Sequence, residues 1–376
     1  MLYKPDIERP RKWYEAFWNR ETLKRPLLIV QSHKDKVKPY RERLVDPVTQ
    51  WTDIDYIIEE KERFFKSIYF AAEAIPHVLV GILNGAIAAF LGCDVEFRHE
   101  TDWFKPVIDD WESYRLNFNP QNKWWKFTKE LTSRMVEAGK NKYLVDLPDF
   151  QSDMDSLSNM RNPSKLCMDL YSYPNKIKEA LNYIFENVYK PTFTELYKIL
   201  TRYTNIVSQW MGIISDKRHD VLQADFSALI SPKMAEEFVI PNIRKEATFL
   251  ERSIFHLDGP DAVDKLDLLL DIKNLGGIQW VPGANSPTAV HWLPMLKKIQ
   301  KKGKVLYISS PPEEVKDLVN ELEPRGLIIA VTRNWDVAGF PDGITPFRNK
   351  READGFVNQV EKWCKRRWYN NKYVLS

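Results

Sequence analysis

The sequence predicts an α/β protein built on parallel β-strands, and three observations carry this prediction. From residue 220 onward, short apolar segments alternate five times with segments of helical periodicity. The short segments are apolar at consecutive positions, as in strands that are covered on both faces. The connections between the segments are short. Repeated β-α units of this kind form either a doubly wound sheet or a closed (β/α)8 barrel.

The five units of the C-terminal half are regular. Strands are expected at 220–226, 254–258, 278–283, 304–309 and 326–332, and helices at 231–253, 260–275, 286–303, 310–323 and 350–367. Three of these helices open with Ser-Pro, at Ser231, Ser286 and Ser310. Serine is a preferred N-cap and proline is tolerated at the first helical position, so we interpret these pairs as helix starts.

The N-terminal half is less regular. Strands are expected at 25–32, 76–82, 143–149 and 206–214, a hairpin at 95–108, and helices at 53–74 and 173–205, the latter interrupted at Pro191. The whole chain holds eight or nine strand candidates, so one strand can lie outside a barrel of eight. No linker or low-complexity segment divides the chain, which favours a single domain over residues 1–376.

Composition and charge exclude several classes of protein. Apolar residues make up 44% of the chain and charged residues 28%, a soluble globular composition. With 55 basic and 52 acidic side chains, the chain lacks the field that nucleic-acid binding requires. It has no apolar run of about 18 residues and no signal peptide. Three cysteines without a CxxC pair make a disulfide framework unexpected. We therefore expect a cytoplasmic protein with no membrane and no nucleic-acid partner.

The segment SIFHLDGP, residues 253–260, is the clearest candidate for a functional site. His256 and Asp258 stand two apart at the end of an expected strand, so their side chains point to the same side. An imidazole and a carboxylate at one point suit a metal ion, a proton relay or a bound polar substrate. The alternative is a hydrogen-bonded pair that only holds a loop. Asp225 and Asp149 also lie at the ends of expected strands and are candidates for the same site.

Tryptophan is the unusual feature of the composition, with 13 residues. Trp210, Trp280 and Trp335 all fall at expected strand ends, and Arg333 is the basic candidate near them. Aromatic faces attract methylated cations by roughly 0.5–2 kcal/mol per ring and also stack on flat rings. These residues predict a pocket for a small methylated or aromatic substrate. The alternative is that the tryptophans only pack the core.

Four segments together resemble the uroporphyrinogen decarboxylase superfamily. They are AFWNRETLKRPLLIV, NGAIAAFLGCDVEFRHETDWFKPVI, VLQADFSALISPKMAEEFVIPNIRKE and FHLDGPDAVDKLDLLLDIKNLGGIQWVPG. The resemblance implies a single-domain (β/α)8 TIM barrel, here with residues 1–25 as an N-terminal helical extension. In such a barrel the active site lies at the C-terminal ends of the strands, where Asp225, His256 and Asp258 fall. The superfamily includes uroporphyrinogen decarboxylases and methyltransferases that move methyl groups between corrinoid proteins and thiols.

The chain departs from both branches. The decarboxylases carry an N-terminal motif, P-x-W-x-M-R-Q-A-G-R-Y, whose arginines hold an acidic tetrapyrrole, and residues 25–44 lack it. The thiol methyltransferases are similar at FHLDGP, but they have a zinc-binding cysteine where Asp258 stands and a later cysteine that residues 328–335 do not provide. The resemblance therefore points to a harder divalent-metal site, for zinc or a similar ion, at His256 and Asp258 with Asp225 as a further candidate.

Three functions remain open. The first is a methyltransferase-like enzyme in which His256 and Asp258 bind a metal or polarise the acceptor and Asp225 is a general base or third ligand; its partners would be a small-molecule substrate and a corrinoid protein. The second is a carboxy-lyase in which Asp225 stabilises a cationic intermediate. The third is a catalytically silent small-molecule binding protein. A monomer and a homodimer are both compatible with the sequence.

Overall fold

A seven-stranded sheet forms the centre of the fold. The computed structural model describes residues 1–21, 24–81, 85–333 and 345–371. The strand order is β2-β1-β13-β12-β11-β10-β9, and every neighbouring pair is parallel except β1 and β2. The strands are β1 Leu27–His33, β2 Ile68–Ala72, β9 His219–Gln223, β10 Arg252–Asp258, β11 Gly277–Val281, β12 Val305–Ser310 and β13 Leu327–Val331.

A second, shorter group of strands comes from the middle of the chain. β3 (His77–Val78) pairs in parallel with β6 (Leu144–Val145), and a parallel bridge from Asp146 to Ser208 joins β6 to β7 (Val207–Ser208). β7 then pairs antiparallel with β8 (Ile214–Ser215). Between the described residues, the strand pairings do not join this group to the larger sheet. The fold is thus α/β with a mostly parallel central sheet, compatible with the expected (β/α)8 barrel.

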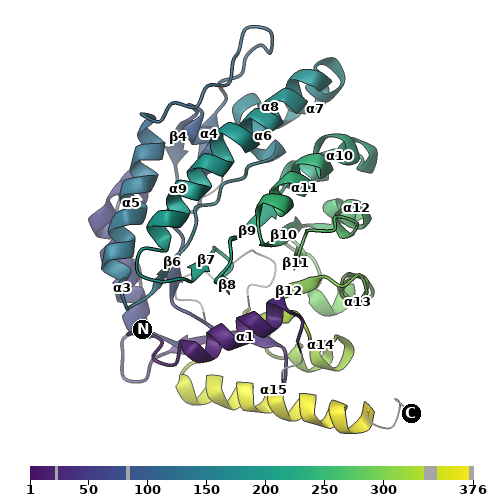
Figure 1. Cartoon of the computed structure of the whole chain (residues 1–376). Helices are drawn as coiled ribbons and strands as arrows, with labels where there is room; N and C mark the ends of the chain where they lie inside the picture. Colours follow the sequence, from purple (N-terminus) through teal and green to yellow (C-terminus); the bar gives the residue numbers. More distant parts are fainter. Residues whose placement is uncertain (22–23, 82–84, 334–344, 372–376) are drawn as a thin grey trace.

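The five C-terminal β-α units occur in the predicted order. Their helices stack along one side of the strands, with α15 below them in Figure 1. They are the 3₁₀ helix η2 Asp225–Leu229, α10 Pro232–Phe238, α11 Ile240–Phe249, η3 Pro260–Lys265 (3₁₀), α12 Leu266–Leu270, η4 Ala289–Trp292 (3₁₀), α13 Leu293–Lys301, α14 Val315–Glu321 and α15 Lys350–Asn371.

Two expectations about these helices need correction. The helix expected at 231–253 is divided at Val239, because Pro241 has no backbone N–H to donate to the preceding turn. Only one of the three Ser-Pro pairs opens an α-helix: Ser231 Oγ accepts from Met234 N at 3.3 Å, whereas Ser310 ends β12 and Ser286 precedes the turn to η4.

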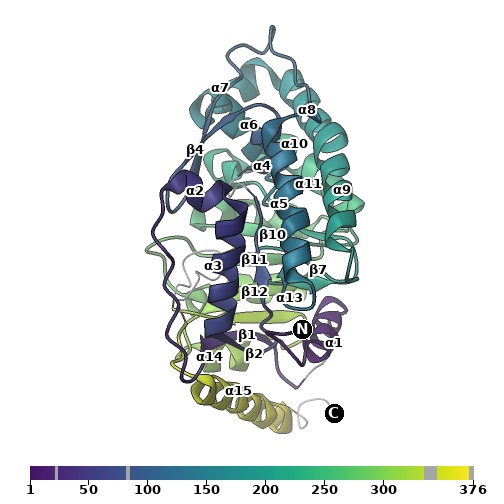
Figure 2. The same cartoon turned by 90° about the vertical axis from the view of Figure 1, so that its left-hand side faces the viewer.

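The N-terminal half contributes longer helices and an antiparallel hairpin. Its helices are α1 Glu8–Trp18, α2 Pro47–Thr52, α3 Ile54–Ser67, α4 Ala86–Phe90, α5 Lys123–Gly139, α6 Met154–Arg161, α7 Pro163–Ser172, α8 Pro174–Tyr183, the π-helix η1 Ile184–Tyr189 and α9 Lys190–Leu200. The hairpin of β4 (Asp94–Phe97) and β5 (Asp102–Lys105) is confirmed. Figure 2 shows α3 and α5 side by side in front of the strands.

Three N-terminal elements differ from the expectation. The helix expected at 53–74 ends at Ser67, and the aromatic and β-branched segment that follows forms β2. Pro191 does not interrupt the long helix, because the wider π-helical turns before it accommodate the missing hydrogen bond. The strand expected at 206–214 is two short strands joined by a loop that carries Trp210.

One apolar cluster of described residues reaches from Tyr14 in α1 to Cys364 in α15. None of the helices in the described part of the chain combines the length and apolar character needed to cross a membrane.

A buried ion pair joins the start of β1 to the end of β2. Arg25 and Glu73 are both fully buried and form a bidentate contact, with Arg25 Nη1 2.6 Å and Nη2 3.0 Å from the Glu73 oxygens. Glu73 Oε2 also accepts from Leu28 N at 3.1 Å. Each partner has one further, longer ion pair, Arg25 Nε with Glu361 Oε1 and Glu73 Oε1 with Arg9 Nη2, both at 3.6 Å. Removal of one partner would therefore leave the other buried with only this weaker compensation.

We expect Glu73→Gln to lower the free energy of unfolding by about 3–5 kcal/mol, because the buried Arg25 would keep its charge, lose its bidentate partner and retain only the longer contact with Glu361. Urea denaturation measures this change. The control is Glu323→Gln, which removes an exposed pair with Arg325 at 3.8 Å and should cost no more than about 1 kcal/mol. Equal losses in the two variants would contradict the prediction.

Candidate functional site

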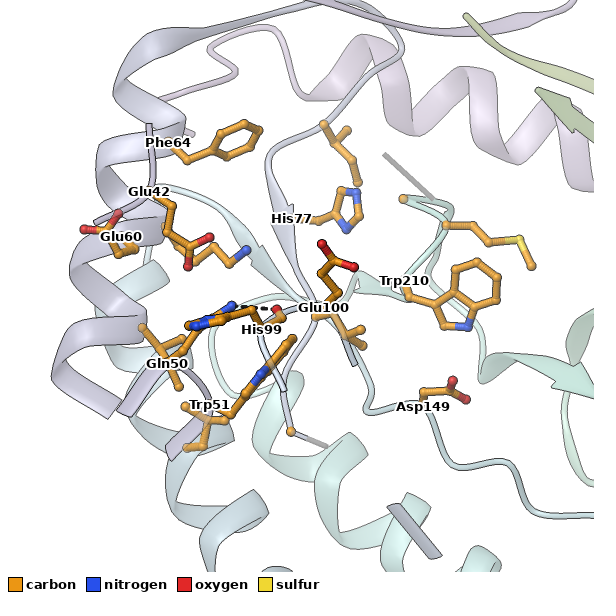
Figure 3. Close-up of a pocket in the computed structure, with 18 of the residues that line it drawn as sticks. Glu42, Gln50, Trp51, Glu60, Phe64, His77, His99, Glu100, Asp149 and Trp210 are labelled. Carbon is orange, nitrogen blue, oxygen red and sulfur yellow. Dashed lines mark hydrogen bonds between the residues drawn. The ribbon is translucent and has the colours of Figure 1, made fainter. Parts of the chain in front are cut away.

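A cavity of about 710 Å³ opens at the carboxyl ends of the central strands. Its inner end is formed by Asp149 after β6, Gln223 in β9, Asp225 in η2, and His256 and Asp258 in β10. Its outer part comes from α2, α3, the segment before α2 and the β4–β5 turn (Figure 3). The outer lining residues include Tyr40, Glu42, Gln50, Trp51, Tyr56, Glu60, Lys61, Phe64, His99 and Glu100.

Asp225, His256 and Asp258 come together at the inner end. One ligand atom from each lies within 4.8 Å of the others, and His256 Nε2 is 3.9 Å from Asp258 Oδ2. Because β9 and β10 are parallel neighbours, their carboxyl ends meet at the same edge of the sheet. The expected convergence of His256 and Asp258 is thus present in the structure, with Asp225 beside them.

The neighbouring strand determines which nitrogen of His256 faces this group. His256 Nδ1 lies 2.6 Å from Oε1 of Gln279, its register partner in β11. With the Gln279 amide in this orientation, its carbonyl oxygen accepts from Nδ1, and Nε2 then presents its lone pair toward Asp258. Burial lowers the pKa of His256, against the opposing effect of the Asp258 charge, and this favours the neutral ring.

The carboxyl groups nearby hold their protons more tightly than usual. Burial, followed by the Asp258 charge, raises the pKa of Asp225 to about 7. The Asp225 side chain is open to the cavity but surrounded by protein elsewhere. Burial also raises the pKa of Asp149 well above its usual range, although Gln223 Nε2 donates to Asp149 Oδ1 at 2.9 Å. A carboxyl with a pKa near 7 can both accept and donate a proton at neutral pH, as a general acid or base must.

Asp155 in α6 positions Asp225 through the backbone. Its two carboxylate oxygens accept from Asp225 N at 2.9 Å and from Phe226 N at 2.7 Å. Burial and then the Asp225 charge raise the pKa of Asp155 to about 7. Residue types alone did not indicate this contact, since Asp155 is 70 positions away from Asp225 in the sequence.

Of the other sequence-predicted residues, Trp210 and Asp149 line the cavity (Figure 3). The Trp210 ring lies edge-on to His256, with centroids 5.3 Å apart and planes at 84°. Arg333 instead lies exposed and pairs with Glu313 at 2.9 Å, outside the cavity lining. Trp335 lies outside the described residues.

The expected pocket wall at Trp280 is not found. Trp280 pairs in register with Leu257, whereas His256 pairs with Gln279. Since successive strand residues face opposite sides, Trp280 points away from His256. It is 1% exposed and packs against Trp292 at a centroid distance of 4.8 Å.

The sequence interpretation also missed one wall of the cavity and its histidines. His77 in β3 and His99 in the β4–β5 turn both line it. His99 Nδ1 lies 2.8 Å from Gln50 Oε1, so the hairpin and α2 hold this wall together (Figure 3). Nothing in the local sequence marks these contacts, because the partners come from separate elements.

The chain matches no family model, and no curated protein matches it. Among solved structures it is similar to a methyltransferase from Methanosarcina mazei, with a TM-score of 0.56 and 12% identity, over 94% of this chain and 98% of that chain. At this identity the similarity shows the fold alone. The chain therefore shares the fold of that methyltransferase, and membership of a superfamily stays a proposal.

The raised pKa of Asp225 predicts a pH-dependent stability. Between about pH 4 and pH 7 the unfolded chain releases this proton while the folded protein keeps it, so the group destabilises the fold increasingly as pH rises. We expect the free energy of unfolding of Asp225→Asn, relative to that of wild type, to be higher at pH 8 than at pH 4.5. Urea denaturation at both pH values measures this difference. The control Ser231→Ala loses a helix cap and should cost about 1 kcal/mol at both values. If the stability of Asp225→Asn relative to wild type were the same at pH 4.5 and pH 8, the prediction would be wrong.

Proposed function

We propose that this protein is a methyltransferase-like enzyme of the uroporphyrinogen decarboxylase superfamily, with a closed (β/α)8 barrel, acting on a small methylated or aromatic substrate. The observation that carries the proposal is the convergence of Asp225, His256 and Asp258 in a cavity at the carboxyl ends of parallel strands. The methyltransferase-like fold supports it. Trp210 would form one wall for the substrate.

The inner residues fit a divalent metal ion with nitrogen and oxygen ligands. His256 offers the Nε2 lone pair, Gln279 holds the ring through Nδ1, and Asp225 and Asp258 offer carboxylates. They do not fit a thiolate-rich zinc site, since Cys93 and Cys364 are buried in the core and Cys167 lies on α7. A bound divalent ion would supply positive charge to polarise an acceptor group.

The chain's own groups would bind and orient the substrate and move its protons. Asp225 would accept or donate a proton at neutral pH, and Asp155 would hold it through two backbone hydrogen bonds. Trp210 would keep water from one side of the site.

The charges of the cavity argue against the carboxy-lyase alternative. The described residues that line it include six acidic side chains and, of lysine and arginine, Lys61 alone; the acids are Glu42, Glu60, Glu100, Asp149, Asp225 and Asp258, of which Asp149 and Asp225 have raised pKa values. Of these six acids, Arg43 and Arg63 form ion pairs with Glu60 alone, and so balance its negative charge. A substrate with eight carboxylates, such as uroporphyrinogen, would need several fixed cations here. A cationic or neutral substrate suits this lining better.

The test of the proposal is methyl transfer from methylcobalamin, a stand-in for a corrinoid protein partner, to a panel of small thiols, phenols and amines. We expect a methylated product by mass spectrometry and a loss of about 100-fold or more in kcat/KM for His256→Ala. The control His291→Ala changes a histidine outside the cavity and should retain activity. Saturable binding without any methylated product would favour the silent binding protein instead.

A second prediction concerns the metal itself. Protein purified without chelators should retain a divalent ion such as zinc or manganese, and His256→Ala should lose most of it, because the variant removes the nitrogen ligand. Elemental analysis by mass spectrometry measures both, with His291→Ala as the matched control. Equal and negligible metal in all three proteins would rule out the metal site and leave acid–base roles for the cluster.

A further inference from the structure

A second group of polar side chains is buried next to the segment 149–155, part of which forms the inner end of the cavity. Asp153 is the N-cap of α6, and Asn242 and Glu246 stand one turn apart on α11. At most 3% of each of these three residues is exposed. None of them lines the cavity, so the group is separate from the candidate active site.

Hydrogen-bond donors surround the two acids of this group. Ser152 Oγ donates to Glu246 Oε1 at 2.5 Å, and Asn242 Nδ2 donates to the same oxygen at 3.1 Å. Met154 N donates to Asp153 Oδ1. Hydrogen bonds donated to an acid stabilise its ionised form, and an O–H···O distance this short is typical of a carboxylate acceptor. The surroundings therefore suit two carboxylates better than two neutral acids.

Three buried oxygens of the group have no hydrogen-bond partner among the described residues. They are Asp153 Oδ2, Glu246 Oε2 and Asn242 Oδ1. Asn242 lies against both acids: it donates to Glu246, and its side chain partly offsets the rise that burial and then the Glu246 charge cause in the pKa of Asp153. An unpaired buried oxygen costs about 1–3 kcal/mol, so three such atoms at one place indicate a further binding partner.

The charge of the group is also unbalanced. Burial raises the pKa of Glu246 to about 8 and that of Asp153 well above its usual range. No lysine, arginine or histidine of the described residues pairs with either acid. Two buried carboxylates therefore need either protons or one divalent cation. We favour the cation, because the donors around the acids stabilise their ionised forms and the free amide oxygen adds a ligand that hard cations accept.

We propose that Asp153, Glu246 and Asn242 bind a hard divalent cation of the Ca²⁺ or Mg²⁺ class through these three oxygens. Carboxylates and amide carbonyls are the protein ligands that such ions prefer. One divalent ion would balance both carboxylates, which offsets the cost of burying them. The group offers no nitrogen or sulfur ligand, and in this it differs from the cluster around His256, which suits zinc or manganese.

The cation would be a structural ion behind the inner end of the cavity. The segment 149–155 includes Asp155, whose carboxylate holds the backbone of Asp225. Asp153 begins α6 within this segment. An ion bound to both Asp153 and Glu246 would tie α6 to α11 and so fix the part of the chain that positions Asp225.

Thermal unfolding tests the proposal without any substrate or methyl donor. Wild-type protein stripped with a chelator should melt about 3 °C or more higher in millimolar Ca²⁺ or Mg²⁺, because the ion binds the folded state alone. Asp153→Asn and Glu246→Gln should lose this shift. Both variants keep the side-chain shape and remove one repelling charge, so they should fold and melt no lower than the stripped wild type.

Two controls separate this site from other acids. Glu236→Gln changes an exposed glutamate of α10, and Asp258→Asn changes the cluster in the cavity; both should keep the whole shift. Calorimetric titration of stripped protein with Ca²⁺ and with Mg²⁺ gives the second readout, and Asp153→Asn should weaken binding by about 100-fold or more.

The absence of a response to either ion in the wild type would show that the two acids hold protons, and would overturn the proposal. An equal shift in Asp153→Asn, or the loss of the shift in Asp258→Asn, would overturn it as well by placing the ion elsewhere. These outcomes leave the proposed function untouched, because none of the measurements depends on methyl transfer.

Discussion

In β10, His256 pairs in register with Gln223 of β9 and with Gln279 of β11. This register decides the composition of the inner cavity, because residues opposite one another in a parallel sheet face the same side. A slip of one residue would turn His256 and Asp258 toward the helices and bring Leu257 into the cavity. It would also break the contact between His256 Nδ1 and Gln279 that leaves Nε2 as the acceptor. The geometry of the cluster is therefore a consequence of strand pairing.

Acidic side chains with raised pKa values lie at the inner end of the cavity and in the protein next to it. Besides Asp149, Asp155 and Asp225, burial raises the pKa of Glu246 to about 8 and that of Asp220 to about 7. Ser152 Oγ and Asn242 Nδ2 donate to Glu246, at 2.5 Å and 3.1 Å, which partly offsets its burial. Asp149 and Asp225 line the cavity, whereas Asp155, Asp220 and Glu246 do not. Acids with perturbed pKa values at a cavity and in the protein next to it are typical of functional sites.

The cavity takes its two ends from different parts of the chain. The regular β-α units place polar side chains at strand ends, and α2, α3 and the β4–β5 hairpin add an aromatic and acidic outer wall. The methyltransferase-like fold constrains where a site can lie, but its chemistry depends on the side chains of these elements. The described cysteines lie away from the cluster and the cavity lining is rich in acids, so nitrogen and oxygen groups set the chemistry that this cavity offers.

Local sequence patterns determined a large part of this description. Apolar segments with helical spacing between them predicted the five C-terminal β-α units, and the spacing of His256 and Asp258 predicted that the two would face one side. Both depend on the period of a single strand or helix, which the sequence displays directly. Tertiary structure alone decided which partners meet. The strand β2, the outward direction of Trp280, and the contacts of Asp155 with Asp225 and of His77 with Asp146 all depend on how separate elements pair. No local pattern encodes these contacts, because register and packing between distant segments are set by the free energy of the whole fold.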